Sequence, residues 1–448
     1  MLSEERGRKL VEQLLGLSHA DEVQVDLESK ETTQLRFARN SPSTSGNASD
    51  VTLSVKSWFG KRSASATVNQ LDEAALKEVL ERSEHLAKLA PEDSEYVPSL
   101  GAQSYPSVNA YDDQTRTGGA HGMVQGSTLC VEQARKLGLE AAGFTMARAR
   151  SNFIGNRNGL RGFHRTTEVS FSETVRSPQA GSGWAASGAN SIAGVDYARC
   201  SATAIDKAQR SVSPRPLAPG KYVTILEPSC VASLMRSLLS SMNQRSADEG
   251  RSFFSAAGGQ TKLGQQLFPE QVTIRSDPAA GAAPGAPWAD SGLPQLPRTW
   301  IDKGRIASLA CDRFWAQKTG AEPIPSASNL LMTGGSGTVA DLVSSTERGV
   351  LITSLWYMVG VNPRTLLYTG LTRDGVFWIE NGKIAYPVTN FRWNDSPASV
   401  LANIDGMRER AGLPAREHLR KHQRAGATSK GIRAEQRVGR GLKNGRTA

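Results

Sequence analysis

Few residues of this chain have the type and spacing that catalysis requires. The segment EHLRKH places His418 and His422 four residues apart, as two metal ligands on one helical face would be. A zinc peptidase with such a pair also needs a glutamate between the histidines to activate the metal-bound water, but Leu419 follows His418 here. The two basic residues before His422 would also repel a cation. We therefore interpret this segment as part of a solvated tail and predict no metal site there.

The segment GGSGTVA, residues 334–340, has the glycine spacing of a dinucleotide-binding loop. Such a loop requires a buried strand before it and an acidic residue at the end of the next strand to bind the ribose. The preceding apolar run is only NLLM, and the following run, GVLITSLWYM, ends without an acid. We interpret the segment as a loop followed by a helix whose start is capped by Thr338 and Asp341.

The remaining nucleophiles and ligands are scattered. Four cysteines lie far apart, with no CxxC pair: Cys130, Cys200, Cys230 and Cys311. This spacing argues against a disulfide framework and a zinc ribbon, and it favours a reducing cytoplasm. No Ser/His/Asp arrangement can be assembled from the sequence. We therefore assign no catalytic residue and no metal ligand to this chain.

One polar segment stands out, Thr372-Arg373-Asp374-Gly375, between the apolar runs LLYTG and VFWIE. Asn381-Gly382 follows VFWIE and precedes KIAYPV, which is a strong β-hairpin signal. The guanidinium and carboxylate of Arg373 and Asp374 could shape a cleft or could hold a tight turn. Both interpretations remain open on spacing alone.

The elements that must position these residues indicate an α+β protein. Alternating apolar residues, such as Val23, Val25 and Leu27, predict half-buried strands near the start. Helices are expected near residues 4–16, 69–90, 129–138 and 195–210, and residues 91–126 are expected to cover the surface without regular structure. We expect an N-terminal and middle α/β-type region with a mixed sheet, residues 1–215, and a larger β-rich C-terminal domain, residues 216–406. The proline-rich segment SPRPLAPG would link them.

The net charge of +10 is confined to the end of the chain. Residues 407–448 hold 12 basic and 3 acidic residues, whereas the remainder is almost neutral. Because this segment has almost no apolar periodicity, we expect it to be a disordered basic tail. It is either an acquired extension or the product of an altered reading frame. Nowhere does an apolar run reach the ~18 residues of a membrane span, and the first residues resemble an amphipathic helix rather than a signal peptide.

The segment that includes the hairpin, RGVLITSLWYMVGVNPRTLLYTGLTRDGVFWIENGKIAYPVTNFRWNDSP, closely resembles the C-terminal signature of the TldD/PmbA family, the modulators of DNA gyrase. The segments LRFARNS, VTLSVKSWFGKRSASATVNQ and PGKYVTILEPSCVASLMRSLLSSM also match. Together they extend the resemblance over roughly residues 5–406. The resemblance implies the family's α+β fold and a subunit of a cytosolic metallopeptidase.

The family has two kinds of subunit, and the resemblance implies which one this is. The TldD kind carries HExxxH on the helix after the strand that reads YVTILE here, together with a later cysteine, and these bind zinc. The corresponding helix, EPSCVASLMRSLLSSM, has no histidine, and no cysteine follows Cys311. The chain therefore resembles the PmbA (TldE) kind, which binds no cofactor itself. Zinc is expected on a TldD-type partner.

The resemblance implies a cytoplasmic peptidase complex that acts on unfolded or short peptides and on peptide precursors. The partner would be a TldD-type zinc subunit, or the chain would form a homodimer. Thr372, Arg373 and Asp374 would contribute to the substrate cleft. Two alternatives stay open: a nucleic-acid or gyrase-associated module that acts through the basic tail, and a stand-alone hydrolase with an unrecognised site. The neutral body and the lack of aromatic residues in the tail make nucleic-acid binding the weaker alternative.

Overall fold

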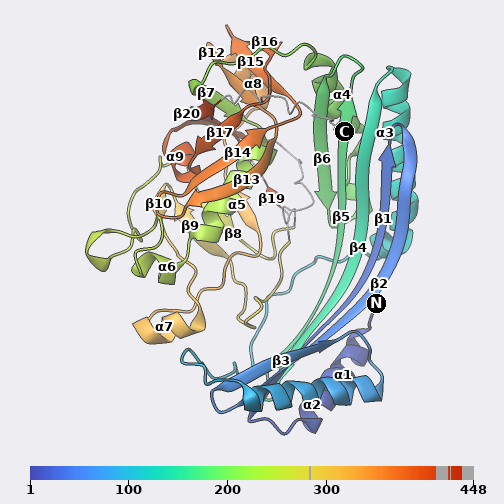
Figure 1. The fold of residues 1–448 in the computed structure, drawn as a ribbon, viewed down its shortest axis with the longest axis vertical. Coiled ribbons are helices and arrows are strands. Elements are labelled where there is room, and N and C mark those ends of the chain that lie inside the picture. The colour runs from blue at the N-terminus through green and yellow to red at the C-terminus, as the bar shows by residue number, and fades with distance from the viewer. Residues whose placement is uncertain (282–283, 410–421, 424, 436–448) are drawn as a thin grey trace, which may run out of the picture.

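The N-terminal part, residues 1–215, is built on one long, curved antiparallel sheet (Figure 1). The computed structural model describes residues 1–281, 284–409, 422–423 and 425–435, with side chains up to Met407. The strand order is β3-β2-β1-β4-β5-β6. The strands are β1 (Glu22–Ala38), β2 (Ser41–Phe59), β3 (Arg62–Val68), β4 (Glu140–Asn156), β5 (Arg161–Arg176) and β6 (Ser182–Ala189).

Helices cover one face of this sheet. The first two, α1 (Glu4–Leu17) and α2 (Glu73–Leu89), pack on one end of the sheet, and α3 (Asp113–Lys136) and α4 (Tyr197–Arg210) pack on the other (Figure 1). A 3₁₀ turn (Ile192–Gly194) precedes α4. Alternation along β1 separates the two faces: Val23, Val25 and Leu27 are buried with α1 and α2, and the residues between them face the C-terminal part.

The α+β class is confirmed, but two local expectations for the N-terminal part are wrong. Its sheet is antiparallel rather than mixed, and parallel pairing occurs instead between β7 and β12 of the C-terminal part. Residues 113–126, expected to cover the surface without regular structure, form the first part of α3. This helix buries small residues such as Gly119, where an added Cβ would lie 3.1 Å from Ala147, so its contact face has little apolar periodicity.

The C-terminal part contains two further sheets. One has the strand order β13-β14-β17-β20-β7-β12-β15-β16, with β18 paired to β20, and the other has the order β10-β9-β8-β11-β19. The strands are β7 (Gly220–Leu226), β8 (Ile274–Ser276), β9 (Arg298–Asp302), β10 (Arg305–Ile306), β11 (Leu330–Met332), β12 (Arg348–Ile352), β13 (Leu355–Asn362), β14 (Leu367–Thr372), β15 (Val376–Glu380), β16 (Lys383–Pro387), β17 (Arg392–Asp395), β18 (Ile404–Glu409), β19 (His422–Gln423) and β20 (Ala425–Glu435).

The core of the C-terminal part lies between these sheets and α5. The helices of this part are α5 (Pro228–Ser241), α6 (Gln244–Asp248), α7 (Arg313–Thr319), α8 (Val339–Ser344) and α9 (Pro397–Ala402), with a 3₁₀ turn at Ala257–Gly259. Trp300 and Trp393 are among the large side chains that pack with α5 in this core. As predicted, Thr338 and Asp341 form a capping box at the start of α8. The predicted hairpin joins β15 and β16 through Asn381 and Gly382, which both have positive φ.

The expectation that residues 407–448 form a disordered tail does not hold for the part of that segment that the structure describes. The backbone of β20 pairs with β7 on one side and with β17 and β18 on the other. Strand pairing uses backbone N–H and C=O groups, so a segment without apolar periodicity can complete a sheet whose neighbours would otherwise be left unpaired. Residues 410–421, 424 and 436–448, which include His418, lie outside the described residues.

Within the described residues, no helix is both long enough and apolar enough to cross a membrane.

Candidate functional site

The predicted polar segment forms a tight turn between β14 and β15. Thr372 is 2% exposed, and its side-chain hydroxyl accepts a hydrogen bond of 3.0 Å from the backbone N–H of Phe391. The hydroxyl of Thr353 donates to the carbonyl of Gly375 at 2.8 Å. Asp374 and Gly375 both have positive φ (56° and 116°), a conformation that favours glycine and tolerates aspartate. Thr372 therefore stabilises the turn and does not face solvent.

The two charged residues of this turn differ in how far they are buried. Asp374 is 5% exposed and accepts a hydrogen bond of 2.8 Å from the hydroxyl of Ser182 on β6, so it joins the two parts of the molecule. The side chain of Arg373 is 40% exposed. Its Nε lies 3.6 Å from Asp374, and its guanidinium lies 4.6 Å from the ring centre of Trp356. Of the three predicted site residues, only Arg373 can reach a ligand directly.

A second joint between the two parts was not predicted from the sequence. Lys207 of α4 donates hydrogen bonds to Glu227 at 2.8 Å and to the carbonyl of Trp184 at 3.2 Å. The two charged side chains are only 8% and 14% exposed. Glu227 is the N-cap residue of α5, so this ion pair anchors the start of that helix to the N-terminal part. The only signal in the sequence was an isolated acid before the helix.

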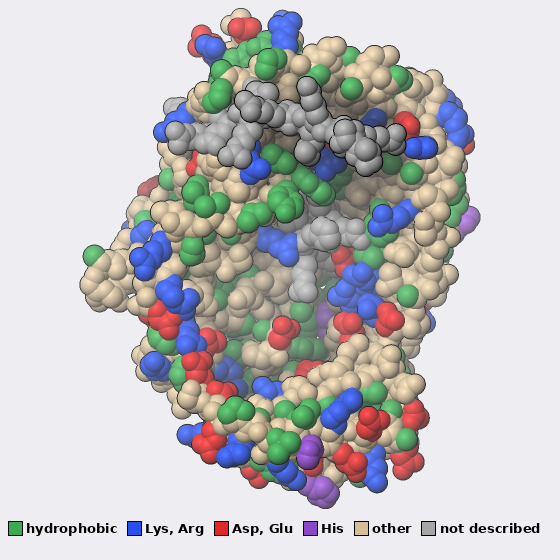
Figure 2. Space-filling view, viewed as in Figure 1, with side chains coloured by type: hydrophobic (Ala, Val, Ile, Leu, Met, Phe, Trp, Pro, Cys, Tyr) green, Lys and Arg blue, Asp and Glu red, His purple; other side chains and the backbone are tan. Residues whose placement is uncertain are grey.

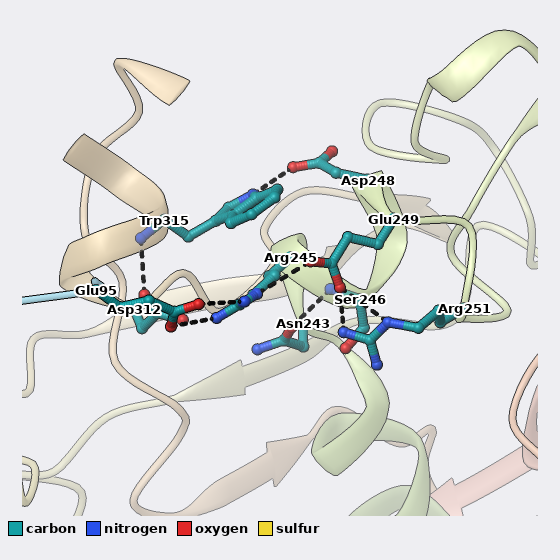
Figure 3. Close-up of polar contacts among 9 residues, drawn as sticks. All are labelled: Glu95, Asn243, Arg245, Ser246, Asp248, Glu249, Arg251, Asp312 and Trp315. Carbon is teal, nitrogen blue, oxygen red and sulfur yellow. Dashed lines mark hydrogen bonds and ion pairs between the residues drawn. The ribbon is translucent and has the colours of Figure 1, made fainter. Parts of the chain in front are cut away.

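A third joint surrounds Arg245 on α6 (Figure 3). Arg245 donates two hydrogen bonds to Glu95, at 2.7 and 2.8 Å, and its guanidinium lies 5.2 Å from the ring centre of Trp315 on α7. The indole N–H of Trp315 donates to Asp248 at 2.6 Å. The bonds from Arg245 keep the pKa of Glu95 below its ordinary value. This cluster connects the segment after α2 to α6 and α7.

The outer edge of β13 adjoins the polar turn and is strongly apolar. Four large side chains along β13 are between 43% and 73% exposed: Trp356, Tyr357, Val359 and Val361. The strand pairs with β14 on one side, and in the part of the chain that the structure describes no strand pairs with its other side. A shift of register after Trp356 and a positive φ at Tyr357 mark a β-bulge. This edge, together with Arg373, offers both backbone hydrogen-bonding groups and apolar contacts to a binding partner.

The helix α5 is the one on which the resemblance described above would place the HExxxH motif of a zinc-binding subunit. Its residues PSCVASLMRSLLSS provide one cysteine, Cys230, which is fully buried with its Sγ 3.4 Å from the carbonyl of Ile352. Among the described residues, no group of three or more His, Cys, Asp or Glu side chains could hold a metal ion. A hydrolytic zinc ion needs about three protein ligands and an open position, so this donor set does not fit it.

A hollow separates the inner face of the long sheet from the C-terminal part (Figure 2). One lobe has a volume of about 860 Å³ and a second has about 500 Å³. The two lobes share six lining residues: Asp26, Ser54, Ala286, Trp288, Asp290 and Ser328. Sequence alternation indicated that Asp26 faces away from the helices, but it could not show that a second domain covers that face.

Comparisons with known proteins agree on one family. A model described as the PmbA/TldA metallopeptidase C-terminal domain matches residues 219–427, and one described as PmbA/TldA metallopeptidase domain 1 matches residues 23–87. A search of curated proteins found no match.

Three solved structures share the fold over nearly the whole chain. A protein named as a modulator of DNA gyrase from Bacteroides thetaiotaomicron has 18% identity and a TM-score of 0.84, with 97% of this chain and 99% of that chain covered. A protein of the same name from Thermotoga maritima has 16% identity and a TM-score of 0.83, with 96% and 100% covered. TldE from Thermococcus kodakarensis has 16% identity and a TM-score of 0.84, with 96% and 99% covered. With both domain models and the fold in agreement, the chain belongs to the TldD/PmbA family.

Proposed function

We propose that this chain is the non-catalytic, PmbA/TldE-type subunit of a cytoplasmic zinc metallopeptidase whose metal is held by a TldD-type partner chain. Its role is to complete the cleft in which unfolded or short peptides and peptide precursors are cleaved. Family membership supports the peptidase context, and the ligand-poor α5 supports the assignment of zinc to the partner.

The observation that carries the proposal is the exposed edge of β13. An edge strand with four exposed large apolar residues is a liability in an isolated protein, because unpaired N–H and C=O groups invite association. Pairing with the TldD-type subunit would cover this edge. Arg373, stacked on Trp356 at the end of the edge, would then lie beside the shared cleft and contact the peptide or the partner.

The proposal is tested by purifying the chain with and without a TldD-type partner, and then measuring zinc content, mass in solution and peptide cleavage. We expect well under one zinc ion per isolated chain, and we expect zinc and cleavage in the complex. Stoichiometric zinc with peptide hydrolysis by the isolated chain would refute the accessory role.

The contribution of the β13 edge is tested by Trp356→Glu, which places a charge in the apolar row and should prevent assembly. The matched control is Leu263→Glu, because Leu263 is also exposed (46%) but lies far from β13 in the sequence and outside the edge. Equal effects of the two substitutions on assembly would show that β13 is not the contact surface.

A further inference from the structure

The hollow between the two parts has an inner wall with an excess of acidic groups. Asp26 and Glu28 of β1 project from this wall, and Asp290 faces them from the loop before β9. Two further acids on the same face are paired, Asp50 with Lys30 at 3.3 Å and Glu168 with Arg148 at 4.0 Å, and Arg150 is the arginine that lines the second lobe. Asp26, Glu28 and Asp290 form no ion pair within the described residues.

Asp26 illustrates the imbalance. It accepts a hydrogen bond of 2.9 Å from the side chain of Gln24. The nearest cation from β2, Lys56, has its ammonium 4.7 Å from the ring centre of Trp58 and is thereby held over that ring. Burial raises the pKa of Asp26 to about 6, and the charge of Asp290 adds to this rise, whereas Gln24 and Lys56 oppose it. Negative charge in the hollow is therefore undercompensated.

The opposite wall is aromatic and held in place. The ring of Trp288 lies 4.9 Å from that of Tyr105 and meets His164 edge-on at 6.2 Å. Tyr105 is itself fixed, because its hydroxyl donates to the carbonyl of Gly292 at 2.8 Å. Trp288 lines both lobes, as does Ser328, whose buried hydroxyl has no hydrogen-bond partner in the described part of the chain.

The combination of carboxylates, a fixed indole and an unused hydroxyl suits one chemical class of ligand. An ammonium or guanidinium group gains charge-assisted hydrogen bonds from carboxylates and a cation–π contact from an indole. A neutral donor can bond to a carboxylate but gains no attraction between opposite charges and no cation–π contact, and an anionic group is repelled. The volume of about 500 Å³ in the second lobe is ample for a long basic side chain and the adjoining backbone.

From this arrangement we propose that the hollow binds the basic side chain of an arginine or lysine residue in an extended peptide, between Asp26 and Asp290 and against Trp288. The peptide nature of the ligand rests on the function proposed above; the cationic nature rests on the hollow itself. The chain would thereby contribute a preference for basic residues to the peptidase complex.

The test uses the full isolated chain and three fluorescein-labelled, N-acetylated peptides of glycine and alanine that differ at one central residue: arginine, glutamine or glutamate. Fluorescence anisotropy measures affinity. The arginine peptide should bind about tenfold more tightly than the glutamine peptide, as expected for hydrogen bonds to a charged group. Asp26→Asn and Asp290→Asn should each remove most of this difference. Asp302→Asn, the same change at an exposed acid on β9, should not.

A pH series provides a second readout. Because Asp26 must be ionised to bind a cation and its pKa is about 6, binding of the arginine peptide should weaken about tenfold between pH 7.5 and pH 5. The Asp26→Asn variant should show a much smaller change. It retains the other charged and titratable groups that line the two lobes, namely Glu28, Lys56, Asp93, Glu95, Tyr96, Arg150, His164, Glu168, Asp290, Cys311, Asp312 and Arg313.

Equal affinity for the arginine and glutamine peptides would overturn the inference. It would also be overturned if Asp302→Asn reduced the affinity difference between these peptides as much as Asp26→Asn or Asp290→Asn does. Spermidine provides a further check. If it displaces the glutamine peptide as strongly as it displaces the arginine peptide, the inference is also overturned, because the hollow would then bind free polyamines rather than peptides. Since no partner chain is needed, a failure here leaves the assembly and zinc measurements untouched. A failure of assembly likewise leaves this binding measurement intact.

Discussion

Glu173 is a carboxylic acid in the core of the N-terminal part, and its titration should control the stability of that part. It lies on β5 between Phe171 and Val175, is 1% exposed, and is surrounded by the contacts of α3 and α4. Neither carboxylate oxygen has a hydrogen-bond partner among the described residues. The hydroxyl of Ser201 and the thiol of Cys130 are near it but do not reach hydrogen-bond geometry.

Burial raises the pKa of Glu173 from 4.5 to about 7, and the nearby Ser201 and Cys130 only partly oppose the rise. A carboxyl group with a raised folded-state pKa contributes stability that is fully present below its unfolded-state pKa and is lost as pH rises through its folded-state pKa. The free energy of unfolding should therefore fall between about pH 4.5 and pH 7 and stay low above it. A change of this size in pKa corresponds to about 3 kcal/mol.

The substitution Glu173→Gln removes the charge with little change of shape, and it isolates this contribution. Relative to the parent chain, the variant should be no more stable at pH 5 and should gain about 3 kcal/mol by pH 8.5. Urea-dependent hydrogen exchange of amides in β4 and β5 measures the stability of the N-terminal part directly, so it is the appropriate assay.

The matched control is Glu168→Gln on the same strand, where the carboxylate is partly exposed and lies 4.0 Å from Arg148. This substitution should change stability by less than about 1 kcal/mol at any pH. If the stability difference between Glu173→Gln and the parent is the same at pH 5 and pH 8.5, the reasoning about the buried carboxylate is refuted.

Three further predictions concern the joints and the sheet edges. Arg373→Ala should leave the melting temperature nearly unchanged but reduce peptide cleavage or assembly of the complex, and a fully active Arg373→Ala complex would limit the turn to a structural role. Asp374→Asn should weaken the contact with Ser182. Lys207→Met should destabilise the chain by about 3 kcal/mol, because it leaves Glu227 buried without its cation. Adding Glu227→Gln should recover part of this loss in a double-mutant cycle, whereas additive losses would show that the two residues are not coupled. A chain that ends at Gln423 lacks β20, and its melting temperature should be at least about 5 °C below that of the parent chain, because β7 and β17 lose their shared neighbour. An unchanged melting temperature would mean that β20 does not stabilise the sheet.

Local patterns determined much of this protein. The apolar face of α1, the capping box of α8 and the turn at Asn381-Gly382 all appear where residue types and spacing predict them, whereas α2 is capped by Asp72 and does not begin at residue 69. These features depend on neighbours within a few residues in the chain, so the sequence carries them directly. The same is true of the absence of HExxxH from EPSCVASLMRSLLSSM, since a motif is read one residue at a time.

Tertiary structure alone decided the features that combine distant residues. It placed Asp374 against Ser182 and exposed Arg373, although the two residues are adjacent and looked equivalent in the sequence. It made a helix of residues 113–126, because small side chains allow close packing without an apolar stripe. It brought Asp26 opposite Asp290, which lies more than 260 residues away along the chain. Alternation along a strand shows which residues share a face, but only the packing of a second domain determines whether that face meets water or encloses a binding site.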